Sequence, residues 1–530
     1  MKVKFVSNGI KFTNNADFKI IVNPALFFIK AYYQLHGKGK IEWLKPIWFI
    51  DKTPYDQYKD IVKESPDFAC FSVYVWNDDH QFELMRLVKQ DNPGVKIIAG
   101  GPQLDAHKDK QFFEKHPYID YVCYGDGEQA FQLIVDREAG LIDPDTPLIN
   151  IVENKGRASK LWPFKMIDDP LFLSTSSFLI QEDFILETYG DLLKSGFRKD
   201  QIEFSIEFAR GCMYSCSFCD WHQNLTKKVK RRKQDWQSEI DFFHDHDIQI
   251  RETDANFGQY PEDLDIFYYA LSLYNPKRNF KFTVRNTSKL KREVVHKMML
   301  DQAIHYNKPI KMSLQDIDQK ILDNIDRPAV PWSTNSKLIR QLHEDIPIDK
   351  KHLLFGEIII GIPGQTRQSV IDMCVELYMC GIRNIISYFW SFLKNSPAAE
   401  TEFSEKYGVQ WVTAYIPNKP FDSSDIESVK SYLRSGSIDA NEWTKIVTID
   451  KHFSMENDDV VDSLFFTILF FDAVKKHKEC VDRDELEKIV EKVKNLVADV
   501  RIKKIRVSDS ELIYAAGKEG KLYSYYGYTK

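Results

Sequence analysis

The sequence predicts an α/β protein with an N-terminal Rossmann-like doubly wound sheet, a partial (β/α)6 TIM-like barrel and a mostly helical C-terminal region. Three patterns predict this architecture. Residues 1–135 alternate short apolar runs with amphipathic segments, as βαβ units do. Six further strand-like runs, separated by helical stretches, occupy residues 201–398. From residue 399 onward the apolar residues recur at helical spacing.

The N-terminal domain, residues 1–135, is expected to bind a ligand at the carboxyl ends of its strands, as doubly wound sheets do. Strands are expected at residues 2–7, 66–76 and 95–102, helices at 24–37 and 80–94, and a strand, turn and helix over 119–135. Glycines lie at the strand ends: Gly100, Gly101, Gly125 and Gly127. Ordinary turns need the same glycines, so either pair alone is a weak sign of a site. Residues 136–200 contain "PDTP" and "DDP" and are expected to be an irregular linker.

The barrel strands are expected at residues 202–209, 247–258, 279–287, 308–315, 353–364 and 382–390. Active sites of such barrels lie at the carboxyl ends of the strands. Seven residues with suitable chemistry gather at these ends: Cys212, Asp254, Asn256, Arg285, Ser313, Gln315 and Gly361. Residues of these types also cap strand ends for purely structural reasons, so no single one of them identifies a site. Their common position at the carboxyl ends of the strands is what predicts the site.

The composition is that of a soluble globular protein, with 43% hydrophobic and 28% charged residues. A net charge of -6 does not favour a nucleic-acid partner. The basic run Lys227–Lys233 is expected to be solvated surface, with nucleic-acid binding or an arginine that holds an anion as alternatives. The chain opens without an apolar leader, and its apolar run Leu464–Phe471 is shorter than the roughly 20 residues of a membrane span. We therefore expect a cytoplasmic protein.

Three of the eight cysteines lie within eight positions, in "RGCMYSCSFCDW": Cys212, Cys216 and Cys219. A structural zinc site takes four ligands, and only His222 is near enough to be considered as the fourth. A [4Fe–4S] cluster takes one ligand per iron, so three cysteines leave one iron open for a small molecule. The spacing therefore favours such a cluster over zinc. The remaining cysteines are expected to be buried small hydrophobes: Cys70, Cys123, Cys374, Cys380 and Cys480.

"RGCMYSCSFCDW" resembles the C-x-x-x-C-x-x-C loop of the radical S-adenosylmethionine superfamily, which also follows the first barrel strand and has an aromatic residue, here Phe218, before the last cysteine. "ETDANFG", "MSLQDIDQKILDNIDR" and "EIIIGIPGQT" resemble later strand segments of that superfamily. "NSPAAETEFSEKYGV" is similar to the segment after the barrel in one subfamily. That subfamily carries a cobalamin-binding domain before the barrel, and "AGGP" and "YGDGE" resemble its turns. The resemblance covers roughly residues 1–410.

The resemblance implies a [4Fe–4S] cluster on Cys212, Cys216 and Cys219, and S-adenosylmethionine on its open iron. Reductive cleavage would give a 5′-deoxyadenosyl radical, and cobalamin would carry the methyl group to an unactivated carbon. An external donor of the flavodoxin or ferredoxin type would supply electrons. The residues expected to contact S-adenosylmethionine are Phe218, Asp254, Asn256, Arg285, Ser313, Gln315, Gly361, Pro363 and Gly364. Those expected to line the cobalamin are Ser72, Tyr74, Trp76, Gly100, Gly101, Gly125 and Gly127, with Trp76 against the lower face of the corrin.

Two departures from the subfamily pattern bear on cobalamin. The loop "VSNGIKFTNNADF" has no D-x-H-x-x-G histidine for cobalt, which is typical of the methylating members and also of a domain that has lost cobalamin. Asp126 stands where a glutamate is usual and preserves the charge. A non-methylating radical enzyme stays the alternative, and a non-catalytic metal or electron-transfer protein the lesser one. The sequence does not predict the substrate, whether a small molecule or a peptide.

Overall fold

The structure is a computed structural model, and it forms two compact units. Unit 1 comprises Met1–Met213, Asp220–Phe257 and Glu262–Phe282, and unit 2 comprises Tyr214–Cys219, Gly258–Pro261 and Thr283–Lys530. The bounds of these units differ from the four domains expected from the sequence, which were divided at residues 135, 200 and 398. That four-domain division stays a prediction. The residues that the structure describes are 1–9, 11–14, 17–156, 159–166, 181–232, 236–273, 280–285, 290–328, 330–417, 443–475, 477, 481–499, 503–508 and 511–515.

The larger sheet of unit 1 has the strand order β10-β9-β8-β7-β6-β1-β4, and β5 also pairs with β1. All of these strands are parallel except β9 and β10, which are antiparallel to their neighbours. The strands are β1 (Lys2–Gly9), β4 (Glu42–Trp43), β5 (Ile47–Phe49), β6 (Phe68–Ser72), β7 (Lys96–Gly100), β8 (Tyr121–Cys123), β9 (Ile151–Asn154) and β10 (Ser159–Leu161).

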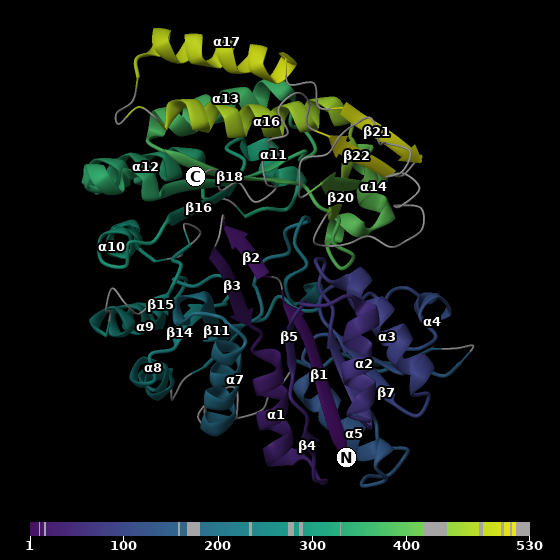
Figure 1. Cartoon of the computed structure of the whole chain (residues 1–530). Helices are drawn as coiled ribbons and strands as arrows, with labels where there is room; N and C mark the ends of the chain where they lie inside the picture. The colour runs from purple at the N-terminus through teal and green to yellow at the C-terminus, as the bar shows by residue number, and fades with distance from the viewer. Residues whose placement is uncertain are drawn as a thin grey trace. The chain divides into compact units, whose positions relative to one another are not determined.

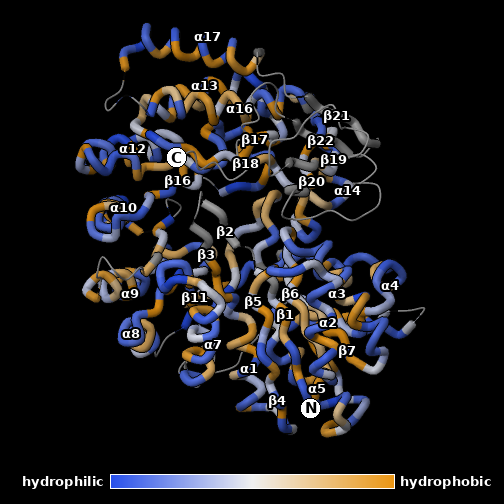
Figure 2. Tube along the Cα trace, viewed as in Figure 1, coloured by the Kyte–Doolittle hydropathy of each residue, from blue (hydrophilic) through white to orange (hydrophobic). Residues whose placement is uncertain are grey.

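Helices flank this sheet, so its central strands are buried and apolar (Figures 1 and 2). The helices are α1 (Ala25–His36), α2 (Pro54–Lys63), α3 (Asp78–Asp91), α4 (Phe112–Lys115) and α5 (Glu128–Glu138). Ile97 and Val122 are fully buried in the resulting core, where each such side chain contributes about 1.5–3 kcal/mol. Thr53 begins α2 by accepting a hydrogen bond from the Asp56 amide. The predicted doubly wound sheet is confirmed.

The second sheet of unit 1, ordered β15-β14-β11-β3-β2, holds the first three predicted barrel strands. These are β11 (Ile202–Ile206), β14 (Gln249–Glu252) and β15 (Phe280–Lys281), accompanied by helices α8 (Trp236–Asp245) and α9 (Pro261–Ser272). The sheet is extended by β2 (Lys11–Asn14) and β3 (Asp17–Val22), which form an antiparallel hairpin. We interpreted this stretch from the sequence as a loop. That interpretation is wrong because β3 pairs with β11, a partner far away in the sequence.

The segment expected to be an irregular linker carries regular structure. It contributes β9 and β10 to the larger sheet, the helix α7 (Glu182–Lys194) and a short 3₁₀ turn at Lys199–Gln201. Residues 167–180 lie outside the described part of the chain. Both strands are short, and the residues of β10 are all exposed, so β10 gives no apolar run in the sequence.

Unit 2 contains the other three predicted barrel strands in a parallel sheet, β16-β17-β18. They are β16 (Ile310–Gln315), β17 (Leu354–Ile360) and β18 (Asn384–Phe389). The helices between and around them are α10 (Arg292–Ile304), α11 (Gln319–Asn324), α12 (Trp332–Asp345) and α13 (Arg367–Cys380), with a 3₁₀ turn at Ile348–Leu353. Each of the six predicted strands is therefore present, three in each unit.

The C-terminal region of unit 2 has the expected helices α14 (Thr401–Tyr407), α16 (Asn457–Val474) and α17 (Arg483–Asp499). Helix α16 contacts both α13 and α17 (Figure 1). An additional sheet, β20-β19-β22-β21, was not predicted. Its strands are β19 (Gln410–Pro417), β20 (Trp443–Lys451), β21 (Lys503–Ser508) and β22 (Glu511–Ala515). Across the described ranges, no helix is long and apolar enough to cross a membrane.

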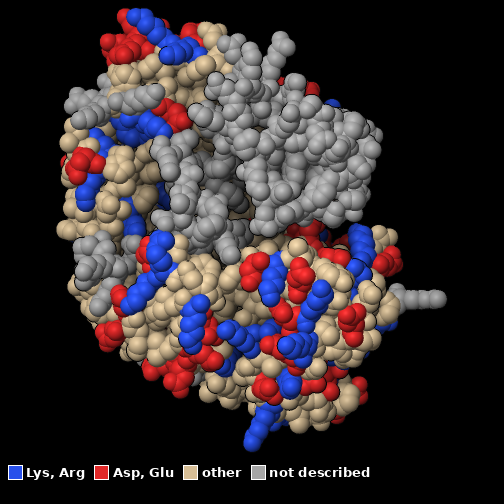
Figure 3. Space-filling view, viewed as in Figure 1, with Lys and Arg blue, Asp and Glu red and all other residues tan. Residues whose placement is uncertain are grey.

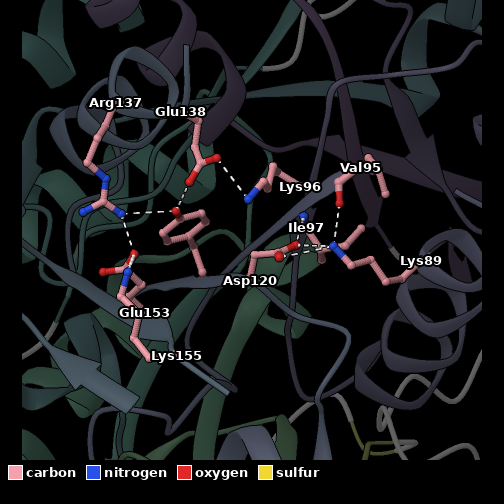
Figure 4. Close-up of polar contacts among 10 residues, drawn as sticks. Lys89, Val95, Lys96, Ile97, Asp120, Arg137, Glu138, Glu153 and Lys155 are labelled. Atoms are coloured by element: carbon pink, nitrogen blue, oxygen red, sulfur yellow. Dashed lines mark hydrogen bonds and ion pairs between the residues drawn. The ribbon is translucent and has the colours of Figure 1, made fainter. Parts of the chain in front are cut away.

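Paired charges line the amino-terminal edge of the larger sheet (Figure 4). The Lys89 ammonium lies 2.8 Å from the Asp120 carboxylate, which also accepts a hydrogen bond from the Ile97 amide. Arg137 lies 2.6 Å from Glu153, and the two side chains are 10% and 4% exposed. These contacts join α3 and α5 to the strands beside them and stabilise the fold.

Candidate functional site

The segment that carries the three cysteines lies between two short paired strands of unit 1. β12 (Ala209–Arg210) precedes it and pairs antiparallel with β13 (Lys230–Arg231). Gly211 has φ +93°, and a Cβ there would lie 2.3 Å from the carbonyl oxygen of Lys228. Only glycine fits that space and that backbone conformation. This lack of space explains why the residue before Cys212 is a glycine.

The thiols of Cys212 and Cys216 receive hydrogen bonds from nitrogen donors, each within one unit. In unit 1 the amide of Asn256 donates to the Cys212 sulfur at 3.2 Å. In unit 2 the Arg327 guanidinium donates to the buried Cys216 sulfur at 3.7 Å and to the Ser313 carbonyl oxygen at 3.0 Å. Positive and N–H groups favour a thiolate over a thiol. The donors therefore suit cysteines that bind metal as thiolates.

The seven described cysteines are reduced, so none of these thiols is held in a disulfide. Among the described residues, no three His, Cys, Asp or Glu side chains converge so as to hold a metal ion. In a [4Fe–4S] cluster each thiolate binds its own iron, so the three sulfurs need not meet at one point. The side chain of His222, the alternative zinc ligand, lies outside the described residues.

Asp254 lies just beyond β14 with one carboxylate oxygen engaged and the other available. Its Oδ1 accepts a hydrogen bond from the Phe208 amide at 2.8 Å. Its Oδ2 is buried and accepts no hydrogen bond from the part of the chain that the structure describes. Burial raises the pKa of Asp254 well above its ordinary value, and the charge of Glu252 raises it further. Such an acceptor suits a cationic ligand group, and the neighbouring Asn256 is turned to Cys212 instead.

The polar residues of β16 in unit 2 meet a carboxylate that the sequence analysis missed. Ser313 donates to Glu357 of β17 at 2.6 Å, and the Lys311 ammonium lies 3.5 Å from it. Burial alone would raise the pKa of Glu357, but Lys311 and Arg285 hold that pKa below its ordinary value. The available signal was one glutamate inside the apolar run "LLFGEIIIG". Gln315 has φ +66° and a buried Oε1 without a hydrogen-bond partner among described residues.

The "GIPGQ" turn after β17 is held by a glutamine that was also missed. The fully buried Gln365 accepts hydrogen bonds from the amides of Gly361 and Ile362 at 2.9 and 3.0 Å, and donates to Asp316 at 2.6 Å. The Pro363 carbonyl accepts from Asn324 at 2.8 Å. The predicted pocket residues Gly361 and Pro363 are therefore buried in a rigid turn, while Gly364 is exposed.

The residues predicted to line cobalamin lie together at the carboxyl edge of the larger sheet. Gly100 ends β7 and Gly101 follows it, Gly125 and Gly127 follow β8, and Ser72, Tyr74 and Trp76 end or follow β6. Tyr74 and Trp76 stack with ring centroids 4.6 Å apart, and Trp76 is 44% exposed. A Cβ on Gly101, where φ is +124°, would lie 2.2 Å from the Val73 carbonyl oxygen. A glycine at position 101 therefore allows the loop after β7 to lie close to the loop after β6.

A histidine on the loop after β7 was not predicted and has no signal in the sequence. The His107 ring stacks on Tyr124 with centroids 4.9 Å apart. Both of its ring nitrogens are buried and have no hydrogen-bond partner within the described ranges. Burial lowers the pKa of His107 to about 4, and Lys108 adds to the effect. A neutral imidazole with two unsatisfied nitrogens suits a polar ligand at this edge, as a cobalamin with amide groups would be.

The basic run is partly engaged within unit 1. Arg231 pairs with Asp263 and Arg232 with Glu239, so these guanidinium groups are not available to an anionic partner. Lys227 and Lys228 are exposed, and Lys233 lies outside the described residues. On the face shown in Figure 3, described basic and acidic side chains are interspersed.

Comparisons with known proteins show which proteins this chain is similar to. Residues 50–135 match the B12 binding domain family. The chain is 26% identical over 414 residues to the cobalamin-dependent radical SAM methyltransferase TokK of Streptomyces tokunonensis, covering 76% of this chain and 58% of TokK. It is 27% identical over 401 residues to the 2-(S-pantetheinyl)-carbapenam-3-carboxylate methyltransferase of Streptantibioticus cattleyicolor, covering 71% and 55%. The chain thus spans less than two thirds of the length of these relatives.

Two solved structures share the fold. The radical S-adenosylmethionine methyltransferase TsrM from Kitasatospora setae, with cobalamin and a [4Fe–4S] cluster bound, superimposes with a TM-score of 0.58 at 14% identity, covering 93% of this chain and 99% of TsrM. OxsB, a cobalamin-dependent S-adenosylmethionine radical enzyme with aqua-cobalamin and S-adenosylmethionine bound, gives 0.60 at 15% identity, covering 94% and 72%. In sequence and in fold, the chain is therefore similar to cobalamin-dependent radical S-adenosylmethionine enzymes, and its residues 50–135 match a B12 binding domain.

Proposed function

We propose that this protein is a radical S-adenosylmethionine enzyme that methylates an unactivated carbon with the help of cobalamin. One observation carries the proposal. The three-cysteine segment after β12 has nitrogen donors on the sulfurs of Cys212 and Cys216, in a chain whose residues 50–135 match a B12 binding domain. The name of the relative TokK contains the same combination of cobalamin and radical S-adenosylmethionine chemistry, and both relatives are named as methyltransferases.

When bound, the [4Fe–4S] cluster, S-adenosylmethionine and cobalamin together supply an adenosyl radical and a transferable methyl group. Cys212, Cys216 and Cys219 would hold the cluster. The buried Oδ2 of Asp254 would accept a hydrogen bond from the methionine ammonium, since charge-assisted hydrogen bonds to carboxylates are strong. The residues that would complete the S-adenosylmethionine site are Phe218, Asn256, Arg285, Ser313, Gln315, Gly361, Pro363 and Gly364.

Cobalamin would lie at the carboxyl edge of the larger sheet, where doubly wound sheets bind their ligands. The exposed Trp76, stacked on Tyr74, offers a flat aromatic face to a corrin. The two unsatisfied nitrogens of His107 offer hydrogen bonds to its amides or its nucleotide tail. Ser72 and the glycine turns would complete the site. A cytoplasmic location and an external donor of the flavodoxin or ferredoxin type are part of the proposal, because the cluster must be reduced.

The test is an anaerobic reconstitution with iron, sulfide and hydroxocobalamin, followed by S-adenosylmethionine and a strong reductant. Iron content, bound cobalamin and nucleoside products would be measured. We expect about four irons and one cobalamin per chain, with both 5′-deoxyadenosine and S-adenosylhomocysteine formed. Cys216→Ala should abolish both the iron and the deoxyadenosine.

The matched control is Cys374→Ala, which changes a buried cysteine of α13 that is outside the cysteine segment. It should keep the iron and both products. Deoxyadenosine without S-adenosylhomocysteine would favour a non-methylating radical enzyme. One tightly bound zinc without iron would contradict the radical assignment.

A further inference from the structure

Two residues that flank the cysteines reach the same turn of the B12-binding domain. This turn, Tyr124–Gly127, follows β8 and is called the β8 turn below. Arg210 lies two residues before Cys212, and Gln223 lies four residues after Cys219. All contacts of these two side chains described here lie within unit 1. The unit 1 residues that flank Tyr214–Cys219 are therefore anchored on both sides.

Arg210 makes the first anchor through a buried group of carboxylates. Its guanidinium lies 2.6 Å from Glu128, 2.8 Å from Glu207 and 3.4 Å from Asp126, and its side chain is 10% exposed. Asp126 belongs to the β8 turn and Glu128 begins the helix after it. Buried charge-assisted hydrogen bonds of this kind fix the geometry of both partners. The contact of Asp126, which stands where the resembled subfamily usually has glutamate, is the longest of the three.

Gln223 makes the second anchor with both ends of its amide. Its Oε1 accepts a hydrogen bond from the Gly125 amide at 2.6 Å. Its Nε2 donates to the carbonyl oxygens of Leu104 and Gly101 at 3.1 and 3.3 Å. Gln223 is 6% exposed, so these bonds are shielded from water. Leu225, two residues further, packs against the core of the larger sheet.

We propose that Arg210 and Gln223 are positioning residues that hold the two unit 1 ends of the cysteine segment, residues 211–213 and 220–224, in one place relative to the turns of the B12-binding domain. The inference rests on the proposed function, in which a cluster on that segment and a cobalamin on those turns act on one substrate. Displacements of about 1 Å can cost two orders of magnitude in rate when reacting groups must meet. An anchor at each end of the segment limits such displacements.

The first test needs no cofactor. Amide hydrogen exchange of residues 211–224 would be measured in the full chain for wild type, Arg210→Gln, Gln223→Ala and the conservative Arg210→Lys. We expect exchange at least tenfold faster in the first two variants and a smaller change in Arg210→Lys. The matched control is Arg137→Gln, which breaks a buried ion pair at the opposite edge of the sheet and should leave residues 211–224 unchanged. Wild-type exchange in both anchor variants would overturn the proposal.

The second test uses the reconstituted chain. The reduced cluster speeds the spin relaxation of cob(II)alamin to a degree that depends on their separation, and power saturation of the cobalt signal measures this. Both variants should bind iron and cobalamin but lose at least half of the enhancement. Enhancement equal to wild type would overturn the anchor role, whereas a wild-type chain without iron or cobalamin would overturn the proposed function and this inference with it. If Arg210→Gln does not fold, the uncharged change Gln223→Ala decides.

Discussion

The two edges of the larger sheet in unit 1 use polar groups in different ways. At the amino-terminal edge, the lysines and the arginine drawn in Figure 4 each meet a carboxylate within 3.0 Å. At the carboxyl edge, His107 buries two ring nitrogens without a partner among the described residues. A similar group lies just beyond the carboxyl end of β14 in the neighbouring sheet. There, Asp254 has a buried carboxylate oxygen that accepts no hydrogen bond from the described residues.

We interpret this difference between the two edges as a division between groups that stabilise the fold and groups that bind a ligand. A buried polar group normally has a partner, and one that lacks it costs free energy unless a ligand completes it. The paired edge therefore contributes to folding, while the edge with unsatisfied groups is where a ligand is expected. The predictions for Arg137, Gly101 and Asp254 each test one side of this contrast, and the one for Arg327 tests the cysteine segment.

The largest effect is expected for Arg137→Met at the paired edge. Removing the guanidinium leaves the Glu153 carboxylate buried with Lys155 and a long hydrogen bond from the Trp162 indole as its remaining partners. We expect a loss of about 3 kcal/mol in the free energy of unfolding, measured with urea, and unchanged cobalamin binding. The control is Arg86→Met, whose pair with Glu83 is 46% exposed on both sides and should cost less than about 1 kcal/mol. Equal costs for the two variants would contradict the structural role.

Gly101→Ala should cost about 2–3 kcal/mol, because the new Cβ adds a clash to the strain of a positive φ. That Cβ would lie 2.2 Å from the Val73 carbonyl oxygen at φ +124°. Gly140→Ala is the control, since Gly140 has φ +68° and nothing within 4 Å of its added Cβ. It should cost about 1 kcal/mol. Similar unfolding midpoints would show that the loop at Gly101 adjusts, and that the glycine is there for a ligand.

The sequence predicted the central strands of the larger sheet and the cysteine segment because their signals are local. Apolar runs and the spacing of three cysteines can be read without knowing what lies nearby. The hairpin of β2 and β3 could not be predicted, because its pairing partner β11 is far along the chain. Gln223 and Gln365 were missed for a related reason. Each bonds to backbone groups of loops, and a single glutamine has no pattern of its own.

Asp254→Asn tests the edge with unsatisfied groups. The variant keeps an oxygen for the Phe208 amide and loses the charge, so the affinity of the reconstituted chain for S-adenosylmethionine should fall at least tenfold, as measured by equilibrium dialysis. Because the folded pKa of Asp254 is raised, wild-type stability decreases as pH rises above 3.8, the ordinary value. Without ligand, the variant should therefore be more stable than wild type at neutral pH, by on the order of 1 kcal/mol. Below the ordinary pKa of 3.8 the two proteins should have similar stability. Lower stability at neutral pH would contradict an unsatisfied carboxylate.

The smallest effect is expected for Arg327→Gln in unit 2. Its guanidinium donates to the Cys216 sulfur at 3.7 Å, and a positive group near a cluster ligand stabilises the reduced, more negative state. The midpoint potential of the reconstituted cluster, followed by electron paramagnetic resonance, should become more negative by an amount on the order of 59 mV, which is a tenfold change for one electron. Arg340→Gln is the control, because Arg340 is 51% exposed and pairs with Glu376 on the surface of α12 and α13. A potential unchanged by Arg327→Gln would show that the guanidinium supports the Ser313 carbonyl only, and that the chemistry of the cysteine segment is set by its own backbone.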